Sequence, residues 1–169
     1  GLTNDDIQQV FLGFQSIKRR MEVIAEHGGI TLIDDFAHHP TALSATITAL
    51  RDKYPGRRLI ACFEPRSNTT TRNIYQHEIT DALALADVAV IGAIDRPQRY
   101  AEQERLSPER VAQDLEKHGV LARAIQDPIE MVEWLAAEAR PGDVIALCSN
   151  GRFGGAHALL KTRLEQLPG

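Results

Sequence analysis

Short apolar runs recur along the chain and alternate with longer segments of mixed polarity. Three of these runs have the length of buried strands: Leu59–Phe63, Val88–Ile91 and Val144–Cys148. Continuous apolar runs are typical of strands that are covered on both faces, as in a parallel sheet. The segments between them have the length and polarity of helices. This alternation predicts an α/β fold with right-handed crossovers.

The complete pattern predicts a sheet of six strands flanked by helices. We expect strands at 20–26, 30–34, 58–63, 87–91, 120–125 and 143–148, and helices at 3–14, 41–54, 72–86, 107–118, 128–139 and 156–167. His27-Gly28-Gly29 predicts a tight hairpin between the first two strands, because glycine accepts positive φ angles. The prediction is therefore one three-layer, Rossmann-like domain over residues 1–169, with a mostly parallel sheet and one antiparallel strand.

Composition narrows the class of protein. The chain has 169 residues, of which 43% are hydrophobic and 25% charged, as expected for one soluble globular domain. Its net charge of -4 argues against nucleic acid as the main partner. No apolar run approaches the ~20 residues of a membrane helix, and no signal peptide is visible. Cys62 and Cys148 lie within apolar runs, which predicts two buried thiols.

Polar clusters follow the carboxyl ends of four predicted strands. They are Asp34–His39, Glu64–Arg72, Asp95–Arg99 and Ser149–Gly155. In a parallel sheet these turns lie on one edge, where ligands bind. The clusters also bring arginines to that edge: Arg66, Arg72, Arg96, Arg99 and Arg152. Arginine captures carboxylates and phosphates in a bidentate manner, so we expect an anionic ligand. The charged loop 93–106 between two of these elements is expected to be either functional or mobile.

The segment from Asp34 to Pro40 is the strongest candidate site. Two carboxylates and two imidazoles, those of Asp34, Asp35, His38 and His39, gather where a buried strand meets a helix. The free N–H groups of a helix N-terminus bind phosphate readily. Each side chain also has a purely structural interpretation, since aspartate often caps turns and either histidine can cap the helix or pack. Their combination favours a site.

Several common catalytic motifs are absent from the sequence. There is no G-x-x-x-x-G-K-[ST] phosphate loop, and no G-x-S-x-G serine elbow. If the chain handles a nucleoside triphosphate, the main phosphate clamp therefore lies on another polypeptide segment.

The motifs together resemble the C-terminal domain of the Mur ligases, the ATP-dependent amide-forming enzymes of peptidoglycan synthesis. The resemblance rests on K-R-R-M-E at Lys18–Glu22 and D-D-F-A-H-H-P-T at Asp34–Thr41. E-P-R-S-N-T at Glu64–Thr69 and S-N-G-R-F-G-G at Ser149–Gly155 narrow it to the murein peptide ligases of cell-wall recycling. The resemblance covers essentially the whole chain.

This resemblance implies a function and roles for individual residues. It implies a bacterial, cytoplasmic ligase that joins UDP-N-acetylmuramate to L-alanyl-γ-D-glutamyl-meso-diaminopimelate with ATP and Mg²⁺. The N-terminal UDP-sugar domain and the central ATPase domain, which holds most of the Mg²⁺ contacts, are absent from this chain, so we expect the fragment alone to be inactive. The implied residues are Arg20 and Asp35 for ATP, His38 and His39 for catalysis, and Arg66, Ser67, Asn68, Thr69, Ser149 and Asn150 for the incoming amino substrate. No residue is expected to bind metal here. Arg152 departs from the family pattern, in which glycine is expected.

Two other hypotheses remain open on the residues alone. Asp34, Asp35, His38 and His39 are plausible ligands of a metal-dependent phosphoesterase. No second carboxylate–histidine cluster supports that interpretation. The other alternative is a non-catalytic module that binds an anionic peptide or nucleotide.

Overall fold

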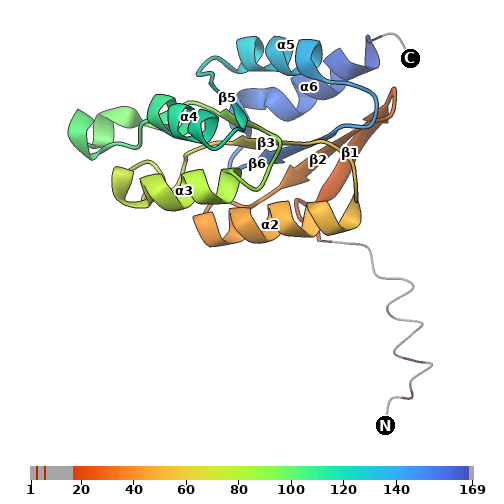
Figure 1. Cartoon of the computed structure of the whole chain (residues 1–169), viewed down its shortest axis with the longest axis horizontal. Coiled ribbons are helices and arrows are strands. Elements are labelled where there is room, and N and C mark those ends of the chain that lie inside the picture. The colour runs from red at the N-terminus through yellow and green to blue at the C-terminus, as the bar shows by residue number, and fades with distance from the viewer. Residues whose placement is uncertain (1–2, 4–5, 7–16, 168–169) are drawn as a thin grey trace.

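A six-stranded sheet forms the centre of the computed structural model, which describes residues 3, 6 and 17–167 (Figure 1). The strands are β1 (Glu22–His27), β2 (Ile30–Asp35), β3 (Leu59–Phe63), β4 (Val88–Ile91), β5 (Leu121–Ala124) and β6 (Val144–Cys148), in the order β1-β2-β6-β3-β4-β5. The β1–β2 pair is antiparallel and the four other pairs are parallel. The predicted fold class is confirmed. The helix expected at 3–14 lies outside the described residues, apart from Thr3 and Asp6.

In the part of the chain that the structure describes, five helices cover the two faces of the sheet. They are α2 (Pro40–Lys53), α3 (Gln76–Leu83), α4 (Pro108–Lys117), α5 (Pro128–Glu138) and α6 (Ala156–Glu165). The first three pack on one face and α5 and α6 on the other, which gives the three expected layers (Figure 1). Local sequence signals set several helix starts. Ser107 caps α4 and Asp127 caps α5, and each cap is followed by proline at the first helical position.

The predicted helix at 72–86 is too long. A 3₁₀ turn, η1 (Asn73–Tyr75), precedes α3, and the helix ends at Leu83. The extended backbone of Arg72 explains the late start, because Arg72 forms an isolated antiparallel bridge with Arg105 and so cannot be helical. The expected hairpin is present, with positive φ angles of 55° at Gly28 and 79° at Gly29.

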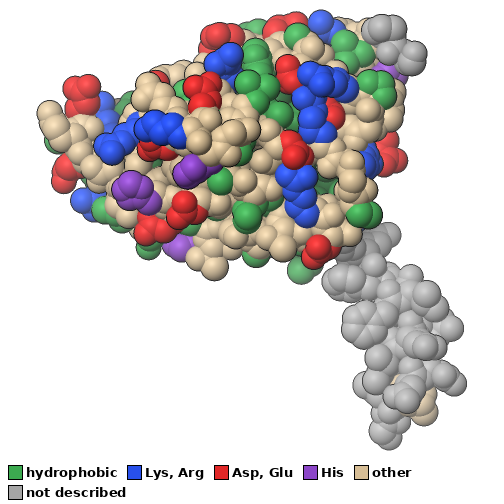
Figure 2. All heavy atoms as spheres, in the orientation of Figure 1, with side chains coloured by type: hydrophobic (Ala, Val, Ile, Leu, Met, Phe, Trp, Pro, Cys, Tyr) green, Lys and Arg blue, Asp and Glu red, His purple; other side chains and the backbone are tan. Residues whose placement is uncertain are grey.

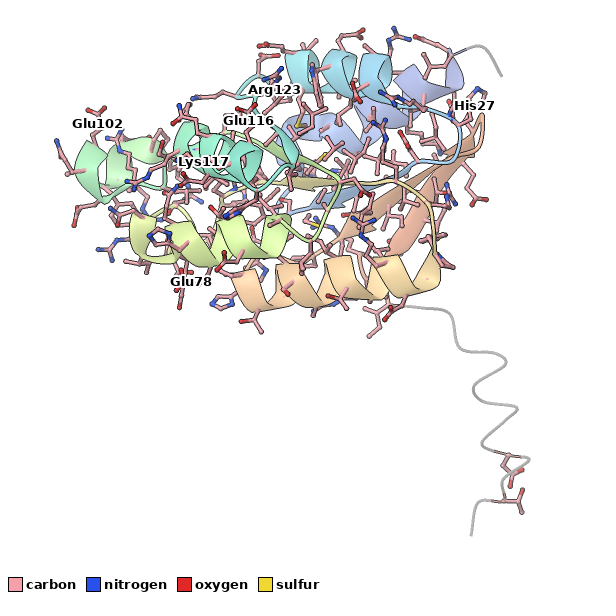
Figure 3. All side chains as sticks on the ribbon, viewed as in Figure 1. His27, Glu78, Glu102, Glu116, Lys117 and Arg123 are labelled. Atoms are coloured by element: carbon pink, nitrogen blue, oxygen red, sulfur yellow. The ribbon has the colours of Figure 1, made fainter. Side chains whose placement is uncertain are left out.

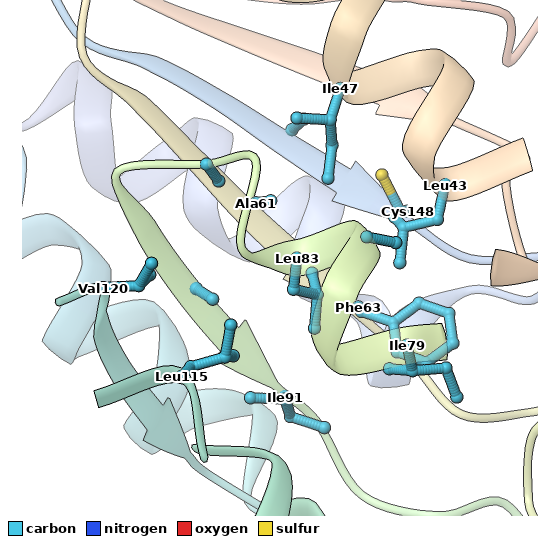
Figure 4. Packing of buried hydrophobic residues seen from close by; sticks show 14 of the residues in the cluster. Leu43, Ile47, Ala61, Phe63, Ile79, Leu83, Ile91, Leu115, Val120 and Cys148 are labelled. Carbon is cyan, nitrogen blue, oxygen red and sulfur yellow. The ribbon is translucent and has the colours of Figure 1, made fainter. Parts of the chain in front are cut away.

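Side chains at alternating strand positions belong to two separate hydrophobic cores, one on each face of the sheet. Phe63, Ile91 and Cys148 point toward α2, α3 and α4, where they pack with Leu43, Ile47, Ile79, Leu83 and Leu115 (Figure 4). Residues of the opposite parity, such as Cys62 and Val90, pack against α5 and α6. Both cysteines are free and buried, as predicted, and they lie on opposite faces of the sheet.

The edge of the sheet at β5 is less buried than its centre. Leu121 is 38% exposed, and Arg123 lies 3.5 Å from Glu116 of α4 (Figure 3). Charged residues of this kind protect an edge strand from pairing with other chains. The loop 93–106 contains two 3₁₀ turns, η2 (Pro97–Arg99) and η3 (Glu102–Glu104). Within the described residues, no helix is both long and apolar enough to span a membrane.

Candidate functional site

The carboxyl ends of the five parallel strands lie in one row. Asp35 of β2 and Phe63 of β3 both pair with Cys148 of β6, and Phe63 in turn pairs with Ile91 of β4. The turns that follow these strands therefore share one edge, which we call the rim: 34–40, 64–72, 92–99 and 149–155. The prediction that the polar clusters converge is confirmed.

Asp35 organises the turn after β2. The residue is 2% exposed, and its carboxylate accepts hydrogen bonds from the backbone N–H of Met21 and Ala37, each at 2.8 Å, and from the hydroxyl of Thr46 at 3.0 Å. These donors compensate for the burial of the charge. Asp35 thus fixes both the start of β1 and the entry into α2. Its expected contact to the ATP ribose remains a prediction.

Asp34 joins two segments that are distant in sequence. Its carboxylate lies 3.0 Å from the Nε atom of Arg19 and 3.0 Å from the Nε2 atom of His157, the second residue of α6. Arg19 also donates to the carbonyl of Ser149. Burial works against ionisation, but the hydrogen bonds and charges of His157 and Arg19 outweigh it and lower the pKa of Asp34. We call these three side chains the Asp34 cluster.

Arg19 and His157 were not among the site residues predicted from the sequence. The run of Lys18, Arg19 and Arg20 has the composition of an ordinary solvated strand start, and His157 lies on a helix whose polarity pattern carries no catalytic motif. The sequence signal was proximity to the candidate motifs, since Arg19 lies within K-R-R-M-E at Lys18–Glu22 and His157 comes two residues after Gly155.

The two predicted catalytic histidines lie at the start of α2. The Nδ1 atom of His38 is 2.9 Å from the carbonyl oxygen of Phe36. His39 caps α2, because its Nδ1 atom accepts a hydrogen bond from the N–H of Thr41 at 3.3 Å, and its ring packs edge-on against Tyr75. The structural interpretation of His39 as a helix cap therefore holds. Catalytic roles for both histidines remain predictions.

Arg20, the other predicted ATP contact, is exposed beside this turn. Its guanidinium lies 5.8 Å from the centre of the Phe36 ring, and that of Arg19 lies 5.3 Å from the same ring. Cation–π contacts of this kind hold the two arginines near the rim.

The turn after β3 carries four of the predicted amino-substrate residues. Ser67 bonds to the hydroxyls of Thr69 and Thr70, so it stabilises the turn itself. Asn68 is exposed and accepts a hydrogen bond of 2.8 Å from Arg99. Arg66 faces a pocket of about 340 Å³, whose lining includes Glu64, Asp95, Gln126 and Phe153. We call it the rim pocket.

The turn after β6 forms the opposite wall of the rim pocket. Ser149 is completely buried, and its hydroxyl donates to Glu64 and accepts from the N–H of Gly151 at 2.8 Å. The Oδ1 atom of Asn150 is buried without a partner among the described residues. Arg152 is exposed and lines a second hollow of about 430 Å³ next to the Asp34 cluster.

The rim is less basic than its five predicted arginines suggest. Arg66 lies 3.5 Å from Asp95 and Arg96 lies 2.9 Å from the same residue, while Arg72 lies 3.6 Å from Glu104. Acidic and basic side chains are also interspersed over the molecular face in Figure 2. Sequence counts of arginine overestimated the positive charge, because the neighbouring carboxylates lie in the loops that the fold brings together.

The described residues offer no group of three or more His, Cys, Asp or Glu side chains that could hold a metal ion. Asp34 bonds to Arg19 and His157, and Asp35 bonds to backbone N–H groups, so these carboxylates do not converge with His38 and His39. This arrangement does not support a metal-dependent phosphoesterase.

Comparison with known proteins identifies the family. The model of the Mur ligase glutamate ligase domain matches residues 19–151. The chain belongs to the Mur ligase family. The matched region contains the turns after β2, β3 and β4 and the start of the turn after β6, so most of the rim lies within the matched domain.

Two relatives of this Mur ligase domain differ in the substrates that their names give. The chain is 34% identical to a UDP-N-acetylmuramate–L-alanyl-γ-D-glutamyl-meso-2,6-diaminoheptandioate ligase of Haemophilus influenzae, over 98% of the chain and 34% of that protein. It is 37% identical to a UDP-N-acetylmuramate–L-alanine ligase of Sorangium cellulosum, over 95% of the chain and 34% of that protein. The chain thus spans about a third of the length of these relatives.

A solved structure shows a similar domain on its own. It is a domain assigned to a UDP-N-acetylmuramate:L-alanyl-γ-D-glutamyl-meso-diaminopimelate ligase of Haemophilus ducreyi, with 36% identity and a TM-score of 0.67. The match covers 86% of this chain and 99% of that one.

Proposed function

We propose that this chain is the C-terminal domain of an ATP-dependent ligase that joins UDP-N-acetylmuramate to L-alanyl-γ-D-glutamyl-meso-diaminopimelate in peptidoglycan recycling. The observation that carries the proposal is the convergence of three motifs on one rim: D-D-F-A-H-H-P-T, E-P-R-S-N-T and S-N-G-R-F-G-G. The other domains of the ligase, with the UDP-sugar site and the phosphate loop, belong in this proposal to the rest of the polypeptide.

The proposed reaction has two steps. The muramyl carboxylate attacks the γ-phosphate of ATP, which gives an acyl phosphate and releases ADP. The α-amine of the peptide then attacks the acyl carbon, and inorganic phosphate leaves. Both steps depend on positioning and on the neutralisation of negative charge. Water must be excluded, because it competes with the amine for the acyl phosphate.

The rim divides into two regions that suit these tasks. On the β2 side, Arg20 is exposed and lies over the Phe36 ring, and His38 contacts the carbonyl of Phe36. Asp35 accepts a hydrogen bond from Met21, the residue after Arg20, so we assign ATP contacts to this region. On the β3 and β6 side, Arg66 faces the rim pocket, and we assign the amino substrate there. Mg²⁺ assists ATP in this proposal, but the described residues do not suit it, so the central domain would hold it.

Closure of this domain over the other two would complete the site. In the closed state the rim would deliver the amine and cover the acyl phosphate. A domain that carries half of each site is expected to bind ATP or peptide weakly and to show no turnover alone. In isolation the domain would therefore behave like the non-catalytic binding module that is one of the alternatives in the sequence analysis.

The substrate is the part of the proposal that the relatives leave open, since alanine ligases match at a comparable identity. The combination of E-P-R-S-N-T at Glu64–Thr69 and S-N-G-R-F-G-G at Ser149–Gly155 favours the peptide.

The test is ADP release by the complete polypeptide with ATP, Mg²⁺ and UDP-N-acetylmuramate, with either the tripeptide or L-alanine as acceptor. We expect ligation with the tripeptide, at a kcat/KM at least tenfold above that with L-alanine, and no ADP release by the 169-residue domain alone. Preference for L-alanine would overturn the substrate assignment, and turnover by the isolated domain would overturn the three-domain mechanism.

A further inference from the structure

Glu64 is a buried carboxylate at the base of the rim pocket. It follows β3 directly and is 8% exposed. A carboxylate in such a position is costly unless hydrogen bonds or a positive charge compensate it. The contacts that do so connect the two walls of the pocket.

The first set of contacts holds the turn after β6. The Oε2 atom of Glu64 accepts hydrogen bonds from the hydroxyl of Ser149 and from the N–H of Phe153, the latter at 3.2 Å. Phe153 has a φ angle of 47°, in the left-handed region that non-glycine residues rarely adopt. Its ring is buried against Gly92, where an added Cβ atom would lie 2.5 Å from the ring. Glu64 therefore anchors a strained residue in the pocket wall.

The second set of contacts holds Arg66. The Oε1 atom of Glu64 lies 3.7 Å from the Nη1 atom of Arg66, and the same nitrogen lies 3.5 Å from Asp95. From the other side, Gly151 packs against the stem of this arginine. A Cβ atom at Gly151 would lie 2.4 Å from the Cδ and Nε atoms of Arg66. Two carboxylates and one glycine thus define the direction of the guanidinium.

We infer that Glu64 is a positioning residue for the amino substrate. One oxygen fixes the turn after β6, and the other orients Arg66 toward the rim pocket. Glu64 itself is buried and acts through Arg66. This inference rests on the proposed function, which places the amino substrate in that pocket.

The variant Glu64→Gln separates the two tasks of this side chain. The amide oxygen of glutamine can still accept from Ser149 and Phe153, so the turn is retained. The amide nitrogen then faces Arg66 and offers no negative charge. Asp95 continues to hold Arg66 from the other side, so we expect a partial rather than complete loss of orientation. Glu165→Gln, at an exposed position on α6, is the matched control.

The kinetic test compares KM values in the complete polypeptide. We expect Glu64→Gln to raise the KM for the amino substrate about tenfold and to change the KM for ATP less than twofold, while Glu165→Gln changes neither. In an Arg66→Ala background, Glu64→Gln should change the KM for the amino substrate less than twofold, since coupled residues are not additive. Equal rises in both KM values, or independent effects in the double variant, would overturn the inference.

A second measurement needs no activity. In the 169-residue domain, whose counterpart from Haemophilus ducreyi is a solved structure by itself, the NMR signal of the Arg66 side-chain Nε–H group reports its surroundings. Glu64→Gln should shift this signal and leave the amide protection of Phe153 unchanged. An unmoved Arg66 signal would overturn the inference even if the proposed ligation is confirmed. Absence of ligation by the wild-type polypeptide would refute the proposed function, and the NMR result would still decide whether Glu64 orients Arg66.

Discussion

The contacts of the Asp34 cluster allow its contribution to the free energy of unfolding to be predicted. Asp34 accepts hydrogen bonds from Arg19 and His157. The exposed fractions of these side chains are 14% for Asp34, 28% for Arg19 and 18% for His157. Asp34→Asn keeps the shape of the side chain but removes the charge that both partners face. Hydrogen bonds to charged groups contribute roughly 1.5–3 kcal/mol each when buried. Solvent screens the partly exposed arginine, so we expect a total loss of about 2 kcal/mol at pH 7.

The pH dependence of this loss has a definite sign. The pKa of Asp34 is lowered in the folded protein: burial opposes the shift, but the contacts with His157 and Arg19 prevail. A lowered pKa stabilises the fold above the unfolded value of about 3.9, and the contribution disappears as the pH falls through the folded value. The part of this difference that comes from the ionisation of Asp34 should therefore shrink as the pH falls below about 4.

Urea unfolding followed by circular dichroism measures this difference. A loss of about 2 kcal/mol in a domain of this size corresponds to a decrease in Tm of roughly 4–8 °C. The control is Asp52→Asn, at an exposed position on α2, which should change the free energy of unfolding by less than about 0.5 kcal/mol. A variant as stable as wild type at pH 7, or a difference that persists undiminished at pH 2.5, would refute the reasoning.

Two further predictions concern packing and thiol chemistry. Gly151→Ala should displace Arg66, because the new methyl group would lie 2.4 Å from its Cδ atom, and should raise the KM for the amino substrate with little change in the KM for ATP. Equal KM values in wild type and variant would contradict this packing argument. Cys62 and Cys148 should not react with a thiol reagent such as DTNB in the native protein but both should react in denaturant, because both are fully buried and burial raises the pKa of each thiol. Rapid labelling of either cysteine without unfolding would show that the sheet opens there.

The fold was largely predictable because its signals are local. Buried strands such as Val144–Cys148 appear as continuous apolar runs, and Ser107 and Asp127 show as helix caps before proline. The start of α3 was not predictable in the same way, since the bridge between Arg72 and Arg105 depends on a loop that returns to the helix start.

The site was predictable as a location but only partly as a set of interactions. Parallel strands place their following turns on one edge whatever the side chains are, so Asp35, His38 and Arg66 were expected together. The partners of each side chain come from elsewhere in the chain. His157 meets Asp34 across 123 positions, and Ser149 meets Glu64 across 85, and neither spacing leaves a periodic trace in the sequence. Pairs of residues this far apart in the sequence can be identified only once the fold is known.

The central claim is that the rim binds the reactants, and an NMR titration of the ¹⁵N-labelled 169-residue domain tests it most directly. Millimolar tripeptide should shift amide signals in the turns at 64–72 and 149–155, and ATP should shift amide signals near Arg20 and at 34–40. The amide signals of α5 and α6 beyond the rim should not shift with either ligand. The account would be contradicted if both ligands shifted only amide signals on the outer surface of α5 and α6, or if no amide signal at the rim shifted at any ligand concentration.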